Sequence, residues 1–171
     1  MTQKPVSRFL VTSDLSRLAR WLRLLGFDTG IAATNNIKDW ARLCNLQNRF
    51  LLTRIKLNNK PNRIMNYLVI QSDAYPEQLK QVIRELDLDE FCIFSRCIYC
   101  NRVVYPIEKS KILDRLPEKV KHREEHFTQC LKCRRIYWKG THFDAMLKTL
   151  NHIILGIVIK NISEFVLTEF R

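Results

Sequence analysis

Two pairs of cysteines have the spacing of a metal site. Cys97 and Cys100 form one C-x₂-C motif, Cys130 and Cys133 form the other, and 29 residues separate the pairs. Each motif directs two thiolates at one point, and two motifs complete a tetrahedral four-sulfur site. We expect structural Zn²⁺, because four thiolates suit this ion and leave no coordination position for a substrate.

Two other interpretations of the cysteines remain. A thioredoxin-like redox motif would explain one pair but not both, and disulfides would require an oxidising compartment. The remaining cysteines, Cys44 and Cys92, have no partner at ligand spacing. We expect both of them to be buried small residues.

The polar run Thr12-Ser13-Asp14 could also hold functional groups. It follows a short apolar stretch, Phe9–Val11, and precedes a helical pattern of leucines. Ser13 or Asp14 can accept hydrogen bonds from the free amides that begin a helix. We therefore expect Asp14 to act as a helix cap, with a role as a metal ligand as the alternative.

The elements that would position these residues alternate between short strands and helices. The strands are expected at Phe9–Val11, Asp28–Ile31, Arg49–Thr53 and Leu68–Ile70, and the helices at Leu15–Leu25, Ile37–Leu46 and Pro76–Leu86. This alternation predicts an α/β fold with a small parallel sheet flanked by helices. Phe91–Phe94 is either a last strand or the crossing into the next module.

Composition divides the chain into three predicted sections. Residues 1–91 carry the α/β pattern, 92–145 the paired cysteines, and 146–171 apolar residues at helical spacing. The last section is predicted to be a helical or docking tail. Residues 1–8 lack the apolar core of a secretory signal, and the apolar run from 153 to 159 is far shorter than the roughly 20 residues of a membrane span. We expect a reducing compartment, either the cytoplasm or an organellar matrix or stroma.

The charge of the chain favours a polyanionic partner. The formal net charge is +12 and the sequence pI is about 9.7, which indicates RNA or a ribonucleoprotein more than a merely solvated basic surface. No acidic residue occurs between Asp39 and Asp73. The predicted RNA-binding residues are Arg17, Arg20, Arg23, Arg54, Lys56, Lys60, Arg63, Arg134, Arg135, Trp138 and His142.

Two residues of this set, Trp138 and His142, could have structural roles instead of contacting RNA. For the neighbouring aromatic residues Tyr137 and Trp138, we expect one of the two to pack over the metal site. His142 can be a hydrogen-bonded structural histidine instead of an RNA contact.

Several segments in this order resemble one family, the Mut-seven C-terminal RNase domain. They are FLV at 9–11, LSRLARWLRLLGFDT at 15–29, LLTR at 51–54, RCIYCN at 96–101, and the second cysteine pair with YWKGTHF, within 130–143. The resemblance covers about residues 8–147 and implies a PIN-like fold with an appended zinc ribbon. It also implies ribonuclease activity, with Mg²⁺ or Mn²⁺ held by carboxylates at the strand ends.

The chain departs from this family at the acidic positions. Thr12 and Ile55 stand where the resemblance implies aspartates, whereas Asp39 matches the middle acidic position. The catalytic candidates are therefore Asp39 and Asp14. We expect an RNA-binding, weakened or inactive ribonuclease. The alternatives are an active ribonuclease dependent on Mg²⁺ or Mn²⁺, and a protein–protein adaptor that docks into a large assembly through its C-terminal tail.

Overall fold

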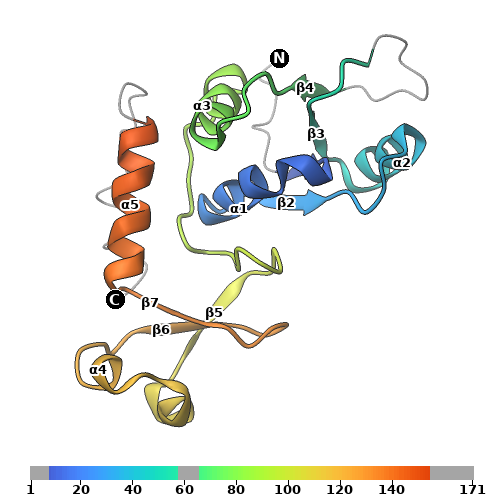
Figure 1. The fold of residues 1–171 in the computed structure, drawn as a ribbon. Coiled ribbons are helices and arrows are strands. Elements are labelled where there is room, and N and C mark those ends of the chain that lie inside the picture. The colour runs from blue at the N-terminus through green and yellow to red at the C-terminus, as the bar shows by residue number, and fades with distance from the viewer. Residues whose placement is uncertain (1–7, 58–65, 155–171) are drawn as a thin grey trace.

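A computed structural model describes residues 8–57 and 66–154 of the chain. Its first sheet has four parallel strands in the order β2-β1-β3-β4 (Figure 1). These strands are β1 (Arg8–Val11), β2 (Asp28–Ile31), β3 (Phe50–Thr53) and β4 (Tyr67–Val69). The predicted α/β fold with a parallel sheet flanked by helices is confirmed.

Three helices accompany these strands. They are α1 (Ser16–Leu24), α2 (Ile37–Gln47) and α3 (Tyr75–Glu85). Each helix has a buried apolar side, as the spacing of the leucines in α1 predicts. Because parallel strands need crossover connections, α1 and α2 also carry the chain back between strands, whereas α3 follows the last strand of this sheet.

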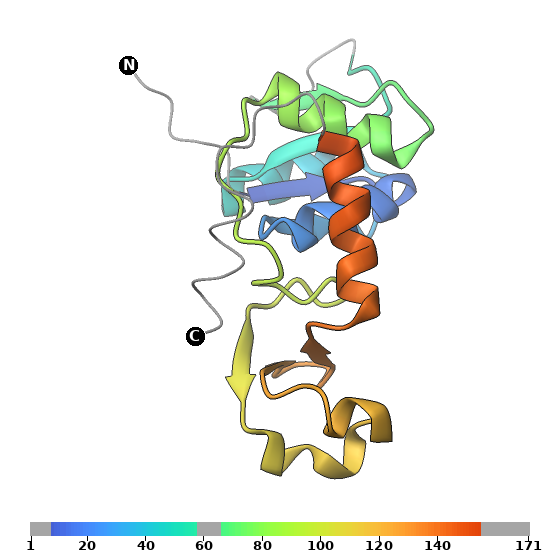
Figure 2. The ribbon, with the colours of Figure 1, turned by 90° about the vertical axis from the view of Figure 1, so that its left-hand side faces the viewer.

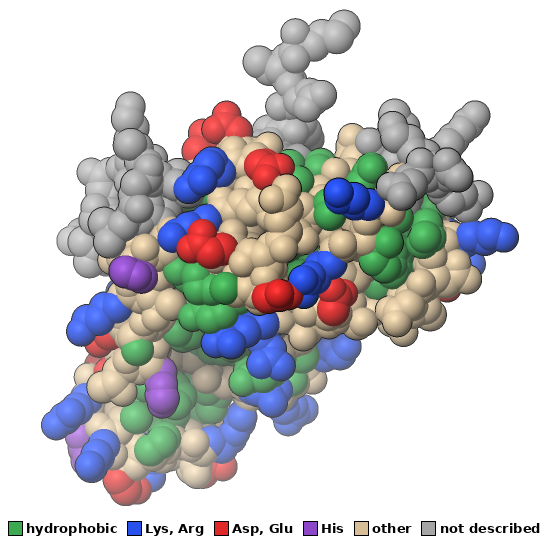
Figure 3. All heavy atoms as spheres, turned by 45° about the horizontal axis from the view of Figure 1, so that its top comes forward, with side chains coloured by type: hydrophobic (Ala, Val, Ile, Leu, Met, Phe, Trp, Pro, Cys, Tyr) green, Lys and Arg blue, Asp and Glu red, His purple; other side chains and the backbone are tan. Residues whose placement is uncertain are grey.

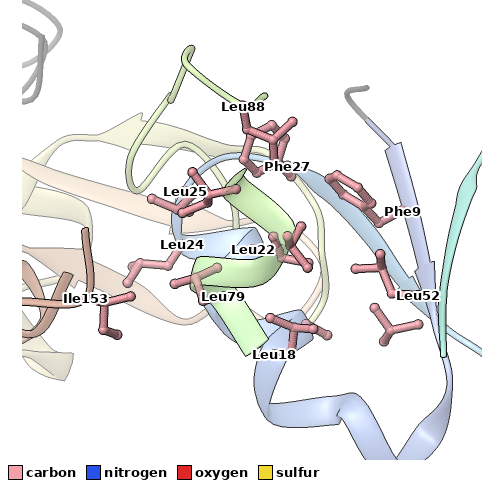
Figure 4. Close-up of a cluster of buried hydrophobic side chains, with 14 of the residues drawn as sticks. Phe9, Leu18, Leu22, Leu24, Leu25, Phe27, Leu52, Leu79, Leu88 and Ile153 are labelled. Carbon is pink, nitrogen blue, oxygen red and sulfur yellow. The ribbon is translucent and has the colours of Figure 1, made fainter. Parts of the chain in front are cut away.

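The central strand β1 is apolar on both sides because helices cover both faces of the sheet. In β1, Phe9 and Val11 point into the cluster shared with α1 and α3, whereas Leu10 lies in the cluster beneath α2 with Trp40. Figure 4 shows Phe9 and Leu52 facing Leu18 of α1 across the larger cluster. The alternation along β1 therefore fixes which helix covers which face.

The second module, the ribbon (residues 96–138), contains a three-stranded antiparallel sheet in the order β5-β6-β7. Its strands are β5 (Val104–Ile107), β6 (Phe127–Cys130) and β7 (Ile136–Trp138). Between β5 and β6 lie two 3₁₀ turns, η2 (Lys109–Lys111) and η3 (Leu113–Arg115), and the short helix α4 (Glu118–Lys121). Only Ile112, Leu116 and Phe127 are buried in the small apolar cluster on this side of the ribbon.

The last helix, α5 (Thr141–Ile154), leaves the ribbon and returns along the first module (Figure 2). Phe143, Leu150 and Ile153 are buried in the same cluster as α1 and α3, and the Phe143 ring stacks on Phe94 at 4.2 Å. The predicted boundary between residues 145 and 146 thus falls within one helix. Residues 155–171 of the predicted tail lie outside the described residues.

Two local expectations are wrong and one alternative is decided. Neither Ser13 nor Asp14 caps α1, because both lie in a 3₁₀ turn, η1 (Ser13–Leu15), and Leu15 occupies the N-cap position without a side-chain hydrogen bond. Of the two alternatives for Phe91–Phe94, the structure shows the crossing to the ribbon, through a turn, and no strand. Cys92 is exposed, whereas Cys44 is buried as expected.

Within the described ranges, no helix has both the length and the apolar character needed to cross a bilayer.

Candidate metal centre and nucleic-acid interface

The four paired cysteines converge on one point. Their sulfur atoms all lie within 4.8 Å of one another, and the sulfurs of Cys97 and Cys133 are 3.7 Å apart. That separation is much longer than the roughly 2.05 Å of a disulfide. Zn–S bonds of about 2.3 Å in tetrahedral geometry place neighbouring sulfurs about 3.8 Å apart. The cluster can therefore hold a metal ion such as zinc.

The two cysteine turns have the same backbone design. In each turn the fifth residue, Asn101 or Arg134, has a left-handed φ of 61° or 58°. Its amide donates to the carbonyl of the first cysteine, at 2.8 Å in one turn and 2.7 Å in the other. Asparagine adopts this conformation readily, whereas a long side chain such as Arg134 does so at a cost.

The thiols differ in how easily they ionise. The pKa of Cys100 is raised to about 12, by burial first and then by the neighbouring sulfurs. Burial opposes ionisation of Cys133 as well, but hydrogen bonds from the backbone and side chain of Arg135 outweigh it and lower that pKa to about 6. A bound cation removes the mutual repulsion of the thiolates, so metal binding and thiol deprotonation are coupled.

Tyr137 packs against the metal centre, and Trp138 does not. The Tyr137 hydroxyl donates to the Cys97 sulfur at 3.0 Å, and burial followed by this hydrogen bond raises the pKa of Tyr137. Trp138 instead packs on Phe127, with ring centroids 6.4 Å apart. One member of the aromatic pair therefore supports the sulfur cluster, which is the division of roles expected from the sequence.

The first cysteine turn is attached to α1 by Arg23. The guanidinium donates to the carbonyl oxygens of Ile98 at 2.9 Å, Tyr99 at 3.1 Å and Thr29 at 2.9 Å. Arg23 is only 6% exposed, so the prediction that it shares an exposed arginine row with Arg17 is wrong. The residue that was expected to contact phosphate holds the ribbon against the first sheet.

Asn101 makes a second attachment that the sequence pattern did not reveal. Its Oδ1 accepts from the amide of Thr29 at 2.9 Å, and its Nδ2 donates to Asp28 at 2.6 Å. The Asp28 carboxylate also accepts from Arg49 at 2.8 Å. The only sequence signal was an asparagine directly after a C-x₂-C motif, a position where the left-handed conformation favours this residue.

These hydrogen bonds make the stability of the protein dependent on pH. Burial opposes ionisation of Asp28, but the bonds from Arg49 and Asn101 outweigh it and lower the pKa below its ordinary value of 3.8. An acid whose pKa is lower in the folded state contributes stability that is complete above its unfolded pKa. That contribution is lost as the pH falls through the folded value.

We expect Asp28→Asn to lower the free energy of unfolding by about 1–3 kcal/mol at pH 7. The difference from wild type should shrink in acid, below about pH 4. Asp73→Asn is the control, because the Asp73 carboxylate pairs with Arg54 at the surface and is 85% exposed. Urea unfolding of the variants at matched pH measures both quantities, and equal effects of the two substitutions at every pH would contradict the assignment.

The carboxyl ends of the two central strands carry threonines. Thr12 and Thr53 are 3% and 0% exposed. Thr53 Oγ1 accepts from the amide of Ile55 at 3.2 Å, whereas Thr12 Oγ1 is buried and has no hydrogen-bond partner among the described residues. The Ile55 side chain is half exposed and offers no ligand atom. A neutral hydroxyl, Thr12, and an apolar side chain, Ile55, therefore stand at the two positions where the resemblance implies aspartates.

The two catalytic candidates do not assemble a metal site at this edge. Asp39 Oδ2 accepts from Thr34 Oγ1 at 2.8 Å in the first turn of α2, and Asp14 lies exposed in η1. Among residues 8–57 and 66–154, the four cysteines are the only group of three or more potential ligands that come together. Mg²⁺ and Mn²⁺ prefer several oxygen ligands, so the residues present do not fit either ion.

Most of the predicted RNA contacts that the structure describes are exposed. Lys and Arg side chains gather near the centre of the face drawn in Figure 3. The exposed members of the predicted set are Arg17, Arg20, Arg54, Lys56, Arg134, Arg135 and His142. Arg54 is engaged by Asp73, and Lys60 and Arg63 lie outside the described residues.

The partly buried Trp138 and the exposed His142 line one groove of about 470 Å³ between α4, β7 and the start of α5. Lys119 and Arg123 add positive charge to its wall. The two predicted contacts from the YWKGTHF segment thus share a concave surface on the ribbon.

Comparison with known proteins gives one match. A family model described as the Mut7-C RNAse domain matches residues 7–150. This range contains both cysteine pairs, the whole first sheet and most of α5. Neither a curated protein nor a solved structure matches the chain.

Proposed function

This chain belongs to the Mut7-C RNAse domain family, and from that premise we propose that it binds RNA and does not cleave it. Membership indicates an RNA-related, nuclease-like function, and the four-cysteine cluster can hold a metal ion. The finer proposal is that this ion is structural zinc and that the nuclease centre is inactive.

The observation that carries the proposal is the chemistry of the strand-end edge. Hydrolysis assisted by Mg²⁺ or Mn²⁺ needs carboxylates that hold the ion and orient the attacking water. At this edge Thr12 is a buried neutral hydroxyl without a partner in the described part of the chain, and Ile55 is apolar. Asp39 is the one family-matching acid, and its Oδ2 is bonded to Thr34. A single carboxylate seldom holds a hard divalent ion firmly unless substrate phosphates complete its coordination.

The charge of the molecule supports the binding half of the proposal. A net charge of +12 attracts phosphates without regard to sequence. Arg134 and Arg135 place exposed cations beside the metal centre, and Arg17 and Arg20 place them on α1. Basic side chains on both modules can therefore contact one RNA chain.

The test is an incubation of the zinc-loaded full chain with labelled single-stranded RNA, in Mg²⁺ or Mn²⁺ and in EDTA. We expect binding that weakens steeply with salt, since each phosphate contact contributes about one unit to the slope of log K against log [salt]. We expect no cleavage above the rate without protein. A mobility shift and a denaturing gel read the two results separately.

The two parts of the proposal, RNA binding and the absence of cleavage, can be contradicted separately. Cleavage that requires Mg²⁺ or Mn²⁺ and is abolished by Asp14→Asn would restore the active-nuclease alternative and place Asp14 in chemistry. Absence of RNA binding at low salt, with full zinc content, would favour the adaptor alternative.

A further inference from the structure

Arginine and tyrosine side chains lie in contact along α1, between the carboxyl ends of the first sheet's strands and the metal centre. The tyrosines come from α3 and from the ribbon. Arg17 lies over the ring of Tyr75, 3.9 Å from its centroid. One turn later, Arg20 lies 5.6 Å from the centroid of Tyr99, a residue inside the first cysteine pair. Arg135, from the second cysteine turn, lies 4.1 Å from the centroid of the same ring. We call these five residues the α1 track.

We propose that the α1 track binds single-stranded RNA, with Tyr99 as the ring on which a base stacks and the arginines as phosphate contacts. The proposal rests on the proposed RNA-binding function, and it specifies that the RNA is single-stranded and which residues contact it. Bases inside a duplex have no free face, whereas those of a single strand can stack on an exposed aromatic ring.

The Tyr99 ring is not needed to attach the ribbon to the first sheet. Its backbone carbonyl is already held by Arg23, and Asn101 and Arg96 bind the same region to the backbone of Thr29 and Gly26. Tyr99 as a whole remains 49% exposed. Attachment of the ribbon therefore accounts for the backbone of this residue, whereas its ring contacts the mobile guanidinium groups of Arg20 and Arg135, and a base can reach it by displacing the more distant Arg20.

One ring of the track is fixed by packing before any ligand arrives. Tyr75 stacks on Trp21 at 5.4 Å with an interplanar angle of 7°. The backbone of Tyr99 is held by Arg23, which positions the second ring near α1. Side chains that are already positioned lose less conformational freedom on binding, which increases the affinity that each contact provides.

Two arginines of the track, Arg17 and Arg20, pair with no carboxylate in the parts of the chain that the structure describes. Arg135 also pairs with no carboxylate there, but its side chain donates a hydrogen bond to the Cys133 sulfur, so the sulfur cluster compensates part of its charge. Stacking on tyrosine leaves the guanidinium edges of Arg17 and Arg20 free to donate to phosphate oxygens. An acidic protein segment would use the same charges, but it would have no flat group to place on Tyr99. The exposed ring therefore favours a nucleic acid.

The test measures binding of a labelled twelve-residue oligouridine to the zinc-loaded full chain by fluorescence anisotropy. We expect Tyr99→Ala to weaken binding about 5- to 50-fold with an unchanged salt slope, because stacking releases no counterions. Tyr99→Phe should keep wild-type affinity within about twofold, since it retains the ring. Arg20→Gln should reduce the salt slope by about one unit.

The matched control is Tyr105→Ala. Tyr105 is a ribbon tyrosine with 51% exposure, close to that of Tyr99, and no arginine stacks on it among the described residues. We expect its affinity to stay within about twofold of wild type.

Wild-type affinity in Tyr99→Ala, with RNA still bound by the parent protein, would overturn the track and leave the RNA-binding function standing. If Tyr99→Ala loses its metal, an Arg17→Gln, Arg20→Gln double variant, whose substitutions lie on α1 and outside the sulfur cluster, tests the track instead, and an unchanged salt slope in that variant would also overturn the proposal. Competition with polyglutamate tests for an acidic protein ligand. If polyglutamate displaces the RNA and binds the Tyr99→Ala variant with the same affinity as wild type, the ligand is an acidic protein segment instead. A parent protein that binds no RNA would refute the proposed function itself.

Discussion

Cys130→Ser is expected to abolish zinc binding and to lower the unfolding temperature by about 10–20 °C. Structural zinc supplies folding free energy directly, because its ligands are not assembled in the unfolded chain. For a chain of this length, each 1 kcal/mol lost lowers the unfolding temperature by about 2–4 °C. The ribbon depends on the ion because its apolar cluster has only three buried side chains.

The loss should not stay within the ribbon. Arg23 and Asn101 bind the first cysteine turn to α1 and β2, and α5 places side chains from beyond the ribbon in the core of the first sheet. We therefore expect one cooperative unfolding transition in calorimetry, shifted as a whole, instead of selective unfolding after Cys92.

Elemental analysis gives the zinc content and differential scanning calorimetry the unfolding temperature. Cys44→Ala is the control, since Cys44 is buried beneath α2 and lies outside the sulfur cluster. The Cys44→Ala variant should keep the metal, and its free energy of unfolding should be only about 1 kcal/mol lower than that of wild type. A wild-type protein that folds fully without metal would exclude a structural ion.

Arg23→Ala is expected to lower the free energy of unfolding by about 3–5 kcal/mol, a large effect for one residue on a helix surface. The substitution leaves the carbonyls of Thr29, Ile98 and Tyr99 without their donor. It also removes a buried cation near the four-cysteine cluster, whose net charge with bound Zn²⁺ would be about −2. Burial lowers the pKa of Arg23, and the thiolates of Cys97 and Cys100 act in the opposite direction.

Zinc affinity should fall together with stability, and competition with a chromophoric chelator measures it. Arg23→Lys should recover only a small part of either quantity, because an ammonium group cannot reach three carbonyls in the planar arrangement of a guanidinium. Arg42→Ala removes an exposed arginine from α2 and should change stability by no more than about 0.5 kcal/mol. A similar cost for Arg23 and Arg42 would contradict the structural role of Arg23.

Local patterns predicted the elements of this fold well. The expected strand at Asp28–Ile31 has the observed bounds of β2, and the cysteine spacing identified all four members of the sulfur cluster. These successes share a cause, because strand length, helical periodicity and ligand spacing all depend on neighbouring residues.

The wrong predictions concern residues whose surroundings are formed by segments distant in the sequence. By periodicity, Arg23 belongs with Arg17 on the polar side of α1, but a turn 75 residues later lies on that side and buries it. Asp14 was expected to cap α1, yet a 3₁₀ turn inserts before the helix and moves the N-cap to Leu15. Tyr99 was overlooked because the sequence does not show that α1 and the ribbon supply arginines to its ring.

The return of α5 onto the first sheet has a consequence for how the protein is made. A ribosome releases the N-terminal strands first, but the apolar cluster they line stays open until Leu150 and Ile153 have emerged. All four metal-binding cysteines leave the ribosome before either residue. Metal capture by the nascent chain can therefore precede closure of the first core, and a ribbon that has already folded around its four cysteines can present α5 to the sheet as soon as this helix emerges.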